Sequence, residues 1–450
     1  MPINKPISLL FFLLTISSFA QKNVNHFKSE IDFGNGTIFS TFLDITIAQD
    51  KFAITSPQNA DVRIMGGKAK LGRLIGKSPK KGIIMVIKGT QKKDSLFGET
   101  NIPMIGKLKF KGAIKNNILS GEFLDDQASP MGTLSGINSA QNKIDYKHLY
   151  PLIIKTVNDN IFSKNALQNK EWKKFQKGIE KLCDNAHDDI ELFLGFNILA
   201  QKLPFTHLTL LISEDVSEGE STSSNKSVVF EEKNDNTAYL LIKNFSNSQK
   251  ELAETLPKII ENKSFKNLVI DLRENGGGGI DAAFALAKYI LTDDMEVGFF
   301  VTNKMQYSGF QSELFNTLPQ LQPKSTKEFT DELKTSKGVK LIFKKPTNPV
   351  FKGNLYVLTN GRTASTCEPI VYALKKTKKA TIIGERTYGG MLAANPFEVY
   401  GKYRIMVPIA DFFTFDGIRL DNVGVDPDIE VKSEEALQKA LELIDNDKKT

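Results

Sequence analysis

The spacing of apolar residues changes along this chain. Up to about residue 140, short apolar runs such as 37–47, 82–87 and 107–113 alternate with Gly, Pro, Asn and Asp, as is typical of strands joined by turns. From Tyr146 to Leu203 the apolar residues recur every three or four positions, which predicts helices over 146–161, 165–183 and 188–203. We therefore expect a β-rich region followed by a small helical bundle.

After a polar stretch at 213–226, predicted strands and helices alternate. Apolar runs predict strands at 238–243, 267–272, 298–302, 354–359 and 380–384, and helices at 279–291 and 364–375. This alternation is typical of an α/β domain with a largely parallel sheet. A charged segment at 306–350 interrupts it, and we interpret this segment as an insertion that could cover a site.

The N-terminus has the features of a signal peptide. Lys5 precedes a short apolar run, and small residues stand at positions 18 and 20. We expect cleavage near Ala20 and export to the periplasm or the cell exterior, with no transmembrane segment in the mature chain. The predicted organisation is therefore a signal peptide (1–20), a β-rich accessory domain (21–140), a helical subdomain (141–212) and an α/β domain (225–450).

Charge and cysteine content narrow the possible functions. The net charge of +7 is spread over many lysines, and no compact Lys/Arg block predicts a nucleic-acid groove. Cys183 and Cys367 are the only cysteines. One disulfide is possible after export, but two partly buried thiols are the favoured interpretation.

Ser365 is the first candidate for chemistry. It lies between the predicted strand 354–359 and an apolar helix that carries Pro369 in its first turn. A hydroxyl at such a turn is exposed at the edge of the sheet, where the helix-start amides can stabilise an oxyanion. The alternative is that Ser365 only caps the helix, because serine is a preferred capping residue.

A run of glycines at 276–279 follows the predicted strand that ends near Asp271. Glycines let the backbone approach a ligand closely and leave its N–H groups free to donate. The run lacks the residues of phosphate-binding loops. It is therefore either a flexible loop or a functional element, namely an oxyanion hole or a cradle for the substrate backbone.

A serine nucleophile needs a base, and histidine is the usual one. Of the four histidines, we expect His148 and His187 on the polar faces of helices and His26 at the start of the β-rich region. His207 stands at a helix-to-strand junction between apolar residues, and taken alone this position favours a half-buried structural histidine. Asp421 lies in a turn rich in Asp, Asn and Gly, and it is either an ordinary turn residue or the group that orients the base.

Taken in order, these segments resemble the tail-specific, or C-terminal processing, serine peptidases. The resemblance covers roughly residues 145–445 and is carried by four motifs. The motifs are Leu-Val-Ile-Asp271-Leu-Arg-x-Asn-Gly-Gly-Gly, Thr363-Ala-Ser365-Thr-Cys-Glu368, Ile382-Ile-Gly384-Glu-Arg-Thr387-Tyr-Gly389-Gly390 and Gly424-Val-Asp-Pro427-Asp428-Ile. The resemblance implies an α/β catalytic domain of the Clp protease/crotonase type.

The chain departs from one branch of that family. Where this branch carries a catalytic lysine, the sequence has Gly390, as in the branch of tricorn protease and the interphotoreceptor retinoid-binding protein. Tricorn-type enzymes use a histidine preceded by a hydroxyl residue, which Thr206-His207 matches, and an acidic residue before the final motif. Asp421 matches that residue with Asp in place of Glu. The stretch between His207 and Ala238 is too short for the PDZ domain that many members carry.

The resemblance implies an exported peptidase with a peptide or protein substrate and no metal or nucleotide. Ser365 would attack the carbonyl, with His207 as base oriented by Thr206 and Asp421. The oxyanion would be held by the amide of Thr366 and by that of Gly277 or Gly278. The main alternative is a non-catalytic peptide- or lipid-binding protein on the same fold. A nucleophilic Cys367 is disfavoured because it lies further into the helix. The sequence assigns no partner to residues 21–140.

Overall fold

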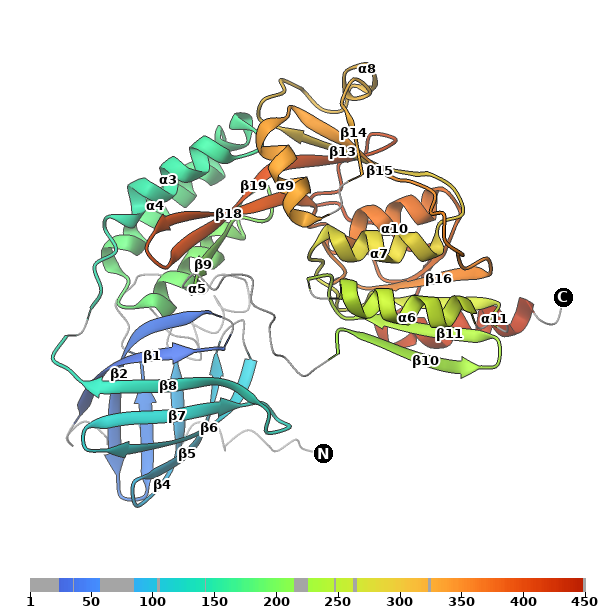
Figure 1. Cartoon of the computed structure of the whole chain (residues 1–450). Helices are drawn as coiled ribbons and strands as arrows, with labels where there is room; N and C mark the ends of the chain where they lie inside the picture. The colour runs from blue at the N-terminus through green and yellow to red at the C-terminus, as the bar shows by residue number, and fades with distance from the viewer. Residues whose placement is uncertain are drawn as a thin grey trace, which may run out of the picture.

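The computed structural model is arranged as an arch, with a barrel at one end and an α/β region at the other (Figure 1). It describes residues 24–34, 36–56, 85–102, 106–141, 143–213, 226–246, 248–261, 265–322 and 325–447. The predicted signal peptide lies outside these residues, and so does most of the polar stretch at 213–226. Helices and a long β-hairpin join the two ends of the arch.

The N-terminal region is a closed antiparallel barrel. Its strands run in order from β1 to β8, and β1 pairs with β8 to close it. The strands are β1 (Asn25–Asp32), β2 (Ile38–Ala48), β3 (Lys51–Thr55), β4 (Val86–Lys92), β5 (Ser95–Ile102), β6 (Gly106–Lys115), β7 (Ile118–Leu124) and β8 (Pro130–Asn138). Alternate residues such as Phe27 and Ile31 are buried, as expected where one face of a strand points into a core. The predicted β-rich region is confirmed.

Three helices follow the barrel among the described residues. They are α3 (Leu149–Asn160), α4 (Lys170–Asn185) and α5 (Asp189–Ala200), with a short 3-10 turn, η2 (Lys164–Leu167), before α4. Side chains of Asn169 and Asp188 cap α4 and α5 by accepting bonds from backbone amides. The expectation for His187 was wrong. It is 2% exposed, because the start of α5 packs against the barrel.

The α/β region contains a sheet with the order β10-β11-β12-β16-β17-β20. Apart from the β10–β11 hairpin its strands are parallel, as predicted. The strands are β10 (Val228–Asn234), β11 (Thr237–Ile242), β12 (Asn267–Asp271), β16 (Asn354–Thr359), β17 (Thr381–Gly384) and β20 (Ile429–Glu430). Helix α11 (Ala436–Asp447), which follows the 3-10 turn η3 (Ser433–Glu435), covers one face. Helices α6 (Gln249–Glu261), α7 (Ile280–Ile290) and α10 (Cys367–Lys376) lie on the other.

A second sheet has the order β14-β15-β13-β19-β18, and β9 also pairs with β19. The members are β9 (Thr209–Ile212), β13 (Met295–Thr302), β14 (Gln320–Leu321), β15 (Gly338–Phe343), β18 (Leu392–Tyr400) and β19 (Tyr403–Thr414). The strand predicted at 298–302 was assigned to the wrong sheet. It pairs antiparallel with β15 and β19, because a fully apolar run does not identify its neighbours.

The segment 306–350 is built into this second sheet. It supplies β14 and β15, together with α8 (Ser312–Phe315) and α9 (Thr326–Thr335). The β18–β19 hairpin runs from the α/β region to the helices, where it contacts α3 (Figure 1). Through β9 and this hairpin, the helical region and the α/β region share one sheet.

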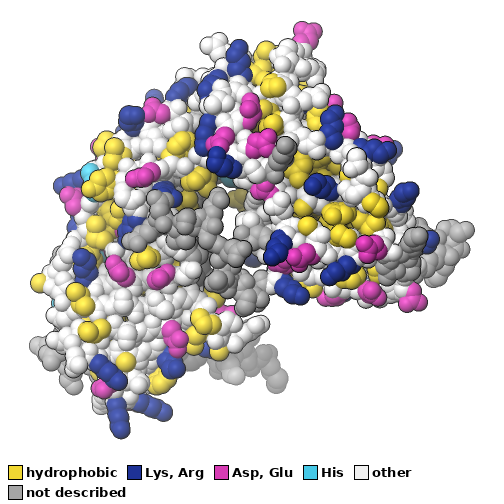
Figure 2. Space-filling view, in the orientation of Figure 1, with side chains coloured by type: hydrophobic (Ala, Val, Ile, Leu, Met, Phe, Trp, Pro, Cys, Tyr) yellow, Lys and Arg dark blue, Asp and Glu magenta, His cyan; other side chains and the backbone are white. Residues whose placement is uncertain are grey.

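No helix within the described residues is long and apolar enough to cross a membrane. On the face drawn in Figure 2, Lys and Arg side chains are scattered among Asp and Glu over both ends of the arch. This distribution agrees with the absence of a compact basic block in the sequence.

Candidate active site

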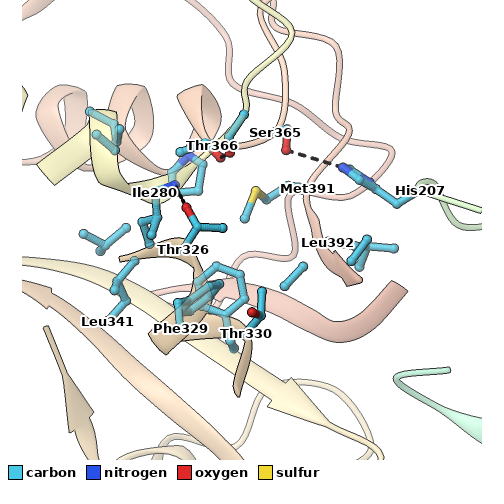
Figure 3. Close-up of a pocket in the computed structure, with 18 of the residues that line it drawn as sticks. His207, Ile280, Thr326, Phe329, Thr330, Leu341, Ser365, Thr366, Met391 and Leu392 are labelled. Atoms are coloured by element: carbon cyan, nitrogen blue, oxygen red, sulfur yellow. Dashed lines mark hydrogen bonds between the residues drawn. The ribbon is translucent and has the colours of Figure 1, made fainter. Parts of the chain in front are cut away.

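Ser365 lies in the turn between β16 and α10, beyond the carboxyl ends of the parallel strands. Its φ of 55° is in the left-handed region, which non-glycine residues adopt at a cost. Thr366, not Ser365, stands at the N-cap of α10, and its side chain makes no capping bond. The serine hydroxyl is therefore not used as a helix cap and points toward His207 (Figure 3).

Glu368 holds this turn in place. Its buried carboxylate accepts hydrogen bonds from the amide of Ser365 (3.0 Å) and the hydroxyl of Thr387 (2.6 Å). It also accepts from the amides of Gly389 (2.7 Å) and Gly390 (2.8 Å). Burial raises the pKa of Glu368, and these hydrogen bonds oppose that rise. The sequence motif contained Glu368, but no role followed from it because three of its four donors lie in another turn.

His207 approaches Ser365 from the helical region, next to β9 of the shared sheet. It directly precedes β9, which is held by pairing with β19 and by a bond from the amide of Leu210 to Asn197 of α5 (3.1 Å). Its backbone also has a positive φ, 66°. The distance from His207 Nε2 to Ser365 Oγ is 3.4 Å. This distance is slightly long for a hydrogen bond.

Thr206 and Asp421 continue the chain of contacts behind His207. The hydroxyl of Thr206 donates to Asp421 Oδ1 at 2.5 Å and lies 2.7 Å from His207 Nδ1. Because its one proton goes to Asp421, the Thr206 oxygen accepts from Nδ1–H. The unprotonated Nε2 then faces Ser365. Asp421 thus contacts the imidazole through Thr206 and not directly.

The electrostatic environment favours a neutral imidazole. Burial lowers the pKa of His207 from 6.5 to about 4, so the ring is unprotonated at neutral pH. Burial has the opposite effect on Asp421 and raises its pKa, while Thr206 and Arg419 oppose the rise. An uncharged imidazole next to a hydroxyl is able to accept its proton.

The glycine run lies directly against the serine. A Cβ at Gly277 would stand 2.6 Å from Ser365 Cβ, so only glycine fits there. The amide of Gly277 donates to Asn275 Oδ1 (2.9 Å) and is already used. The amides of Gly278 and Thr366 have no hydrogen-bond partner among the described residues. Of the two glycines left open by the sequence, Gly278 is therefore the one with a free donor.

Two cavities meet at Ser365 and His207. One, of about 180 Å³, is apolar and is walled by side chains from α7, α9 and β18 (Figure 3). Its lining includes Phe300, Phe329, Phe343 and Met391. The other is more polar and is lined by residues that include Gln201, Tyr388 and Asn422. Ser365 and His207 therefore lie at the junction of an apolar and a polar cavity.

The remaining candidates lie elsewhere or are inert. His26 contacts Asp44 on the barrel, and His148 stands just before α3. Both cysteines are free and buried. Burial raises the pKa of the Cys367 thiol, whose sulfur faces the carbonyl of Asn275. Within the described residues, no cluster of His, Cys, Asp and Glu has the arrangement of a metal site.

Comparison with known proteins gives consistent matches. Residues 236–431 match the profile of the family described as Peptidase family S41. The chain is 26% identical over 191 residues to carboxyl-terminal-processing peptidase 1, chloroplastic, of Arabidopsis thaliana, covering 42% of this chain and 32% of that protein. It is 32% identical over 89 residues to tricorn protease of Thermoplasma acidophilum, covering 19% of this chain and 8% of that protein.

The chain thus spans about a third of the length of the first of these relatives. Among solved structures, a lipoprotein from Streptococcus agalactiae aligns with a TM-score of 0.46 and 17% identity, covering 69% of this chain and 99% of that one. The resemblance drawn from the sequence motifs is confirmed by the family match.

Proposed function

We propose, from the match of residues 236–431 to the profile of peptidase family S41, that this chain is a serine peptidase in which Ser365 is the nucleophile and His207 the base. The observation that carries the proposal is the continuous chain of contacts from Asp421 through Thr206 and His207 to Ser365. Such a chain holds the imidazole in the orientation and tautomer that a serine nucleophile requires.

The reaction follows from these positions. Ser365 Oγ attacks the carbonyl carbon of a peptide bond as its proton passes to His207 Nε2. The amides of Gly278 and Thr366 donate to the oxyanion of the tetrahedral intermediate. Nε2 then gives its proton to the leaving amine, and the acyl group stays on Ser365. Water, deprotonated by Nε2, attacks the ester and releases the acid, and the proton returns to Ser365.

The surroundings support a role for the other regions of the chain. The polypeptide substrate would lie across the junction of the two cavities, with an apolar side chain in the cavity walled by Phe300 and Phe329. Residues 1–20 would direct export, and the barrel would act as an accessory domain. N-terminal sequencing of the mature protein tests the export signal, because cleavage near Ala20 would leave a chain that begins at Gln21.

A fluorophosphonate probe tests the proposed nucleophile. The wild-type protein should be labelled on Ser365, and Ser365→Ala and His207→Ala should both lose the label. The exposed residues Ser312 and His148 provide matched controls, and Ser312→Ala and His148→Ala should be labelled as the wild type is. A wild-type protein that stays unlabelled although it is folded would refute the peptidase and favour the peptide- or lipid-binding alternative.

A further inference from the structure

Arg419 lies behind Asp421, on the side away from His207. Its Nε is 2.9 Å from both carboxylate oxygens of Asp411 on β19. Its NH2 group is 3.3 Å from Asp421 Oδ2, and its NH1 group donates to the backbone carbonyl of Asp421 (3.3 Å). The side chain of Asp421 is fully buried, so this guanidinium is its neighbouring positive charge.

The direction of the hydrogen-bond chain depends on the charge of Asp421. An ionised Asp421 can only accept, so Thr206 donates to it and accepts from His207 Nδ1–H. A protonated Asp421 could donate to Thr206, whose own proton would then point to Nδ1. The single proton of the neutral imidazole would move to Nε2, and Nε2 could no longer take the proton of Ser365.

We propose that Arg419 is a positioning residue that keeps Asp421 ionised and so fixes the tautomer of His207. This inference rests on the proposed function of Ser365 and His207 as nucleophile and base. Arg419 touches neither of them and acts only through Asp421 and Thr206. Burial raises the pKa of Asp421, so the carboxylate needs a compensating charge to remain ionised.

Other groups that face this pair act in the opposite direction or are neutral. Asp411 shares the guanidinium with Asp421, and its negative charge disfavours ionisation of Asp421. Tyr307 donates to Asp411 (3.3 Å), and Asn422 donates to Asp421 Oδ2 (3.1 Å). The remaining titratable group is His207, across Thr206. Substitutions at 419 and 411 should therefore have different effects on the tautomer.

The experiment is nitrogen-15 NMR of protein labelled at histidine, which reports the tautomer without any substrate. Wild-type His207 should carry its proton on Nδ1 at pH 5, above its own pKa of about 4. Arg419→Gln should move it to Nε2, whereas Asp411→Asn and Arg419→Lys should leave it on Nδ1. An Nδ1–H tautomer in Arg419→Gln, or an Nε2–H tautomer in Asp411→Asn, would overturn the inference. If Arg419→Gln does not fold, an Nε2–H tautomer in Asp411→Asn would still overturn the inference.

The pH dependence of fluorophosphonate labelling separates this inference from the proposed function. In Arg419→Gln the acid limb should move upward by about 1–3 pH units, with the rate recovering at higher pH. Asp411→Asn should cause no upward shift. An equal loss at every pH in Arg419→Gln would mean a structural role only and would contradict the inference, while leaving Ser365 as the nucleophile. A wild-type protein that is not labelled at all would instead refute the proposed function, and the NMR result would still test Arg419.

Discussion

Ser365 and His207 face each other from two regions that hold them in different ways. The serine turn is held by its own neighbourhood, because Glu368 lies three residues on and its other donors lie within the next turn of the same sheet. His207 is 158 residues away from Ser365 in sequence, and its position depends on β9, on α5 and on the bond from Thr206 to Asp421. The proposed nucleophile is therefore held by local contacts, whereas the position of the proposed base depends on how distant regions pack.

The packing that holds the base extends to the barrel. Asp189, at the start of α5, is fully buried and accepts from the amide of Ser40 on β2 and from Lys402 Nζ, each at 2.7 Å. The hydroxyls of Tyr146 (2.8 Å) and Tyr403 (2.7 Å) donate to the same carboxylate. One carboxylate thus joins the barrel, the helices and the β18–β19 hairpin. A substitution at Asp189 should therefore displace His207 more than it displaces Ser365.

The largest effect on the labelling rate is expected when Thr206, which links Asp421 to His207, is substituted. Thr206→Val removes the hydroxyl between Asp421 and His207 but leaves the Glu368 contacts intact. The rate of fluorophosphonate labelling should fall by roughly 10³–10⁴, comparable to the loss when the orienting acid of a triad is made neutral. Thr292→Val, at an exposed threonine, is the control and should behave as the wild type does. Labelling at the wild-type rate in Thr206→Val would show that His207 is oriented by something else.

A substitution at Glu368, which holds the turn of Ser365, should give the next largest effect on the labelling rate. Glu368→Gln places an amide among four donors, so at least one buried donor loses its acceptor. We expect labelling to fall by roughly 10² because the Ser365 turn loosens, and the free energy of unfolding to fall by about 2–4 kcal/mol. Nitrogen-15 NMR should still find the Nδ1–H tautomer of His207. A changed tautomer would mean that the two sides are not independent.

A substitution at Asp189, which joins the barrel to the helices and the hairpin, should have a smaller effect on the labelling rate. Asp189→Asn removes the ion pair with Lys402, and breaking a buried pair costs about 3 kcal/mol of stability. The folded variant should be labelled more slowly, by about tenfold, because a small displacement of His207 weakens its contact with Ser365. Chemical denaturation and labelling rates measure the two quantities. Loss of stability with an unchanged labelling rate would show that the base does not depend on the barrel.

The smallest expected effect is in the wild-type protein: the midpoint of its labelling against pH should lie below the ordinary pKa of histidine. His207 must be neutral to accept the serine proton, and burial lowers its pKa from 6.5 to about 4. Labelling should therefore reach half its maximum near pH 4 and be complete by pH 6.5. The measurement is the labelling rate as a function of pH. A midpoint near 6.5 would mean that the imidazole is solvated and not enclosed as described.

The same contrast explains what could be predicted from the sequence. The turn around Ser365 and the glycine run were predictable because strand, turn and helix follow each other directly in the chain. The resemblance, and not periodicity, pointed to Thr206 and Asp421, whose contact spans 215 residues. Glu368 and Arg419 received no role because the sequence does not show that Glu368 also reaches the 387–390 turn, or that Arg419 lies against the carboxylates of both Asp411 and Asp421. An apolar strand such as β13 does not indicate which sheet it joins, and its assignment to the parallel sheet was wrong for that reason.

The most direct test is a crystal structure of the fluorophosphonate adduct. The phosphorus atom should be bonded to Ser365 Oγ, with the phosphoryl oxygen within hydrogen-bond distance of the amides of Gly278 and Thr366. His207 Nε2 should lie beside Ser365 Oγ, with Thr206 still between the imidazole and Asp421. An adduct on another residue, or a His207 ring turned away from the modified serine, would contradict the account.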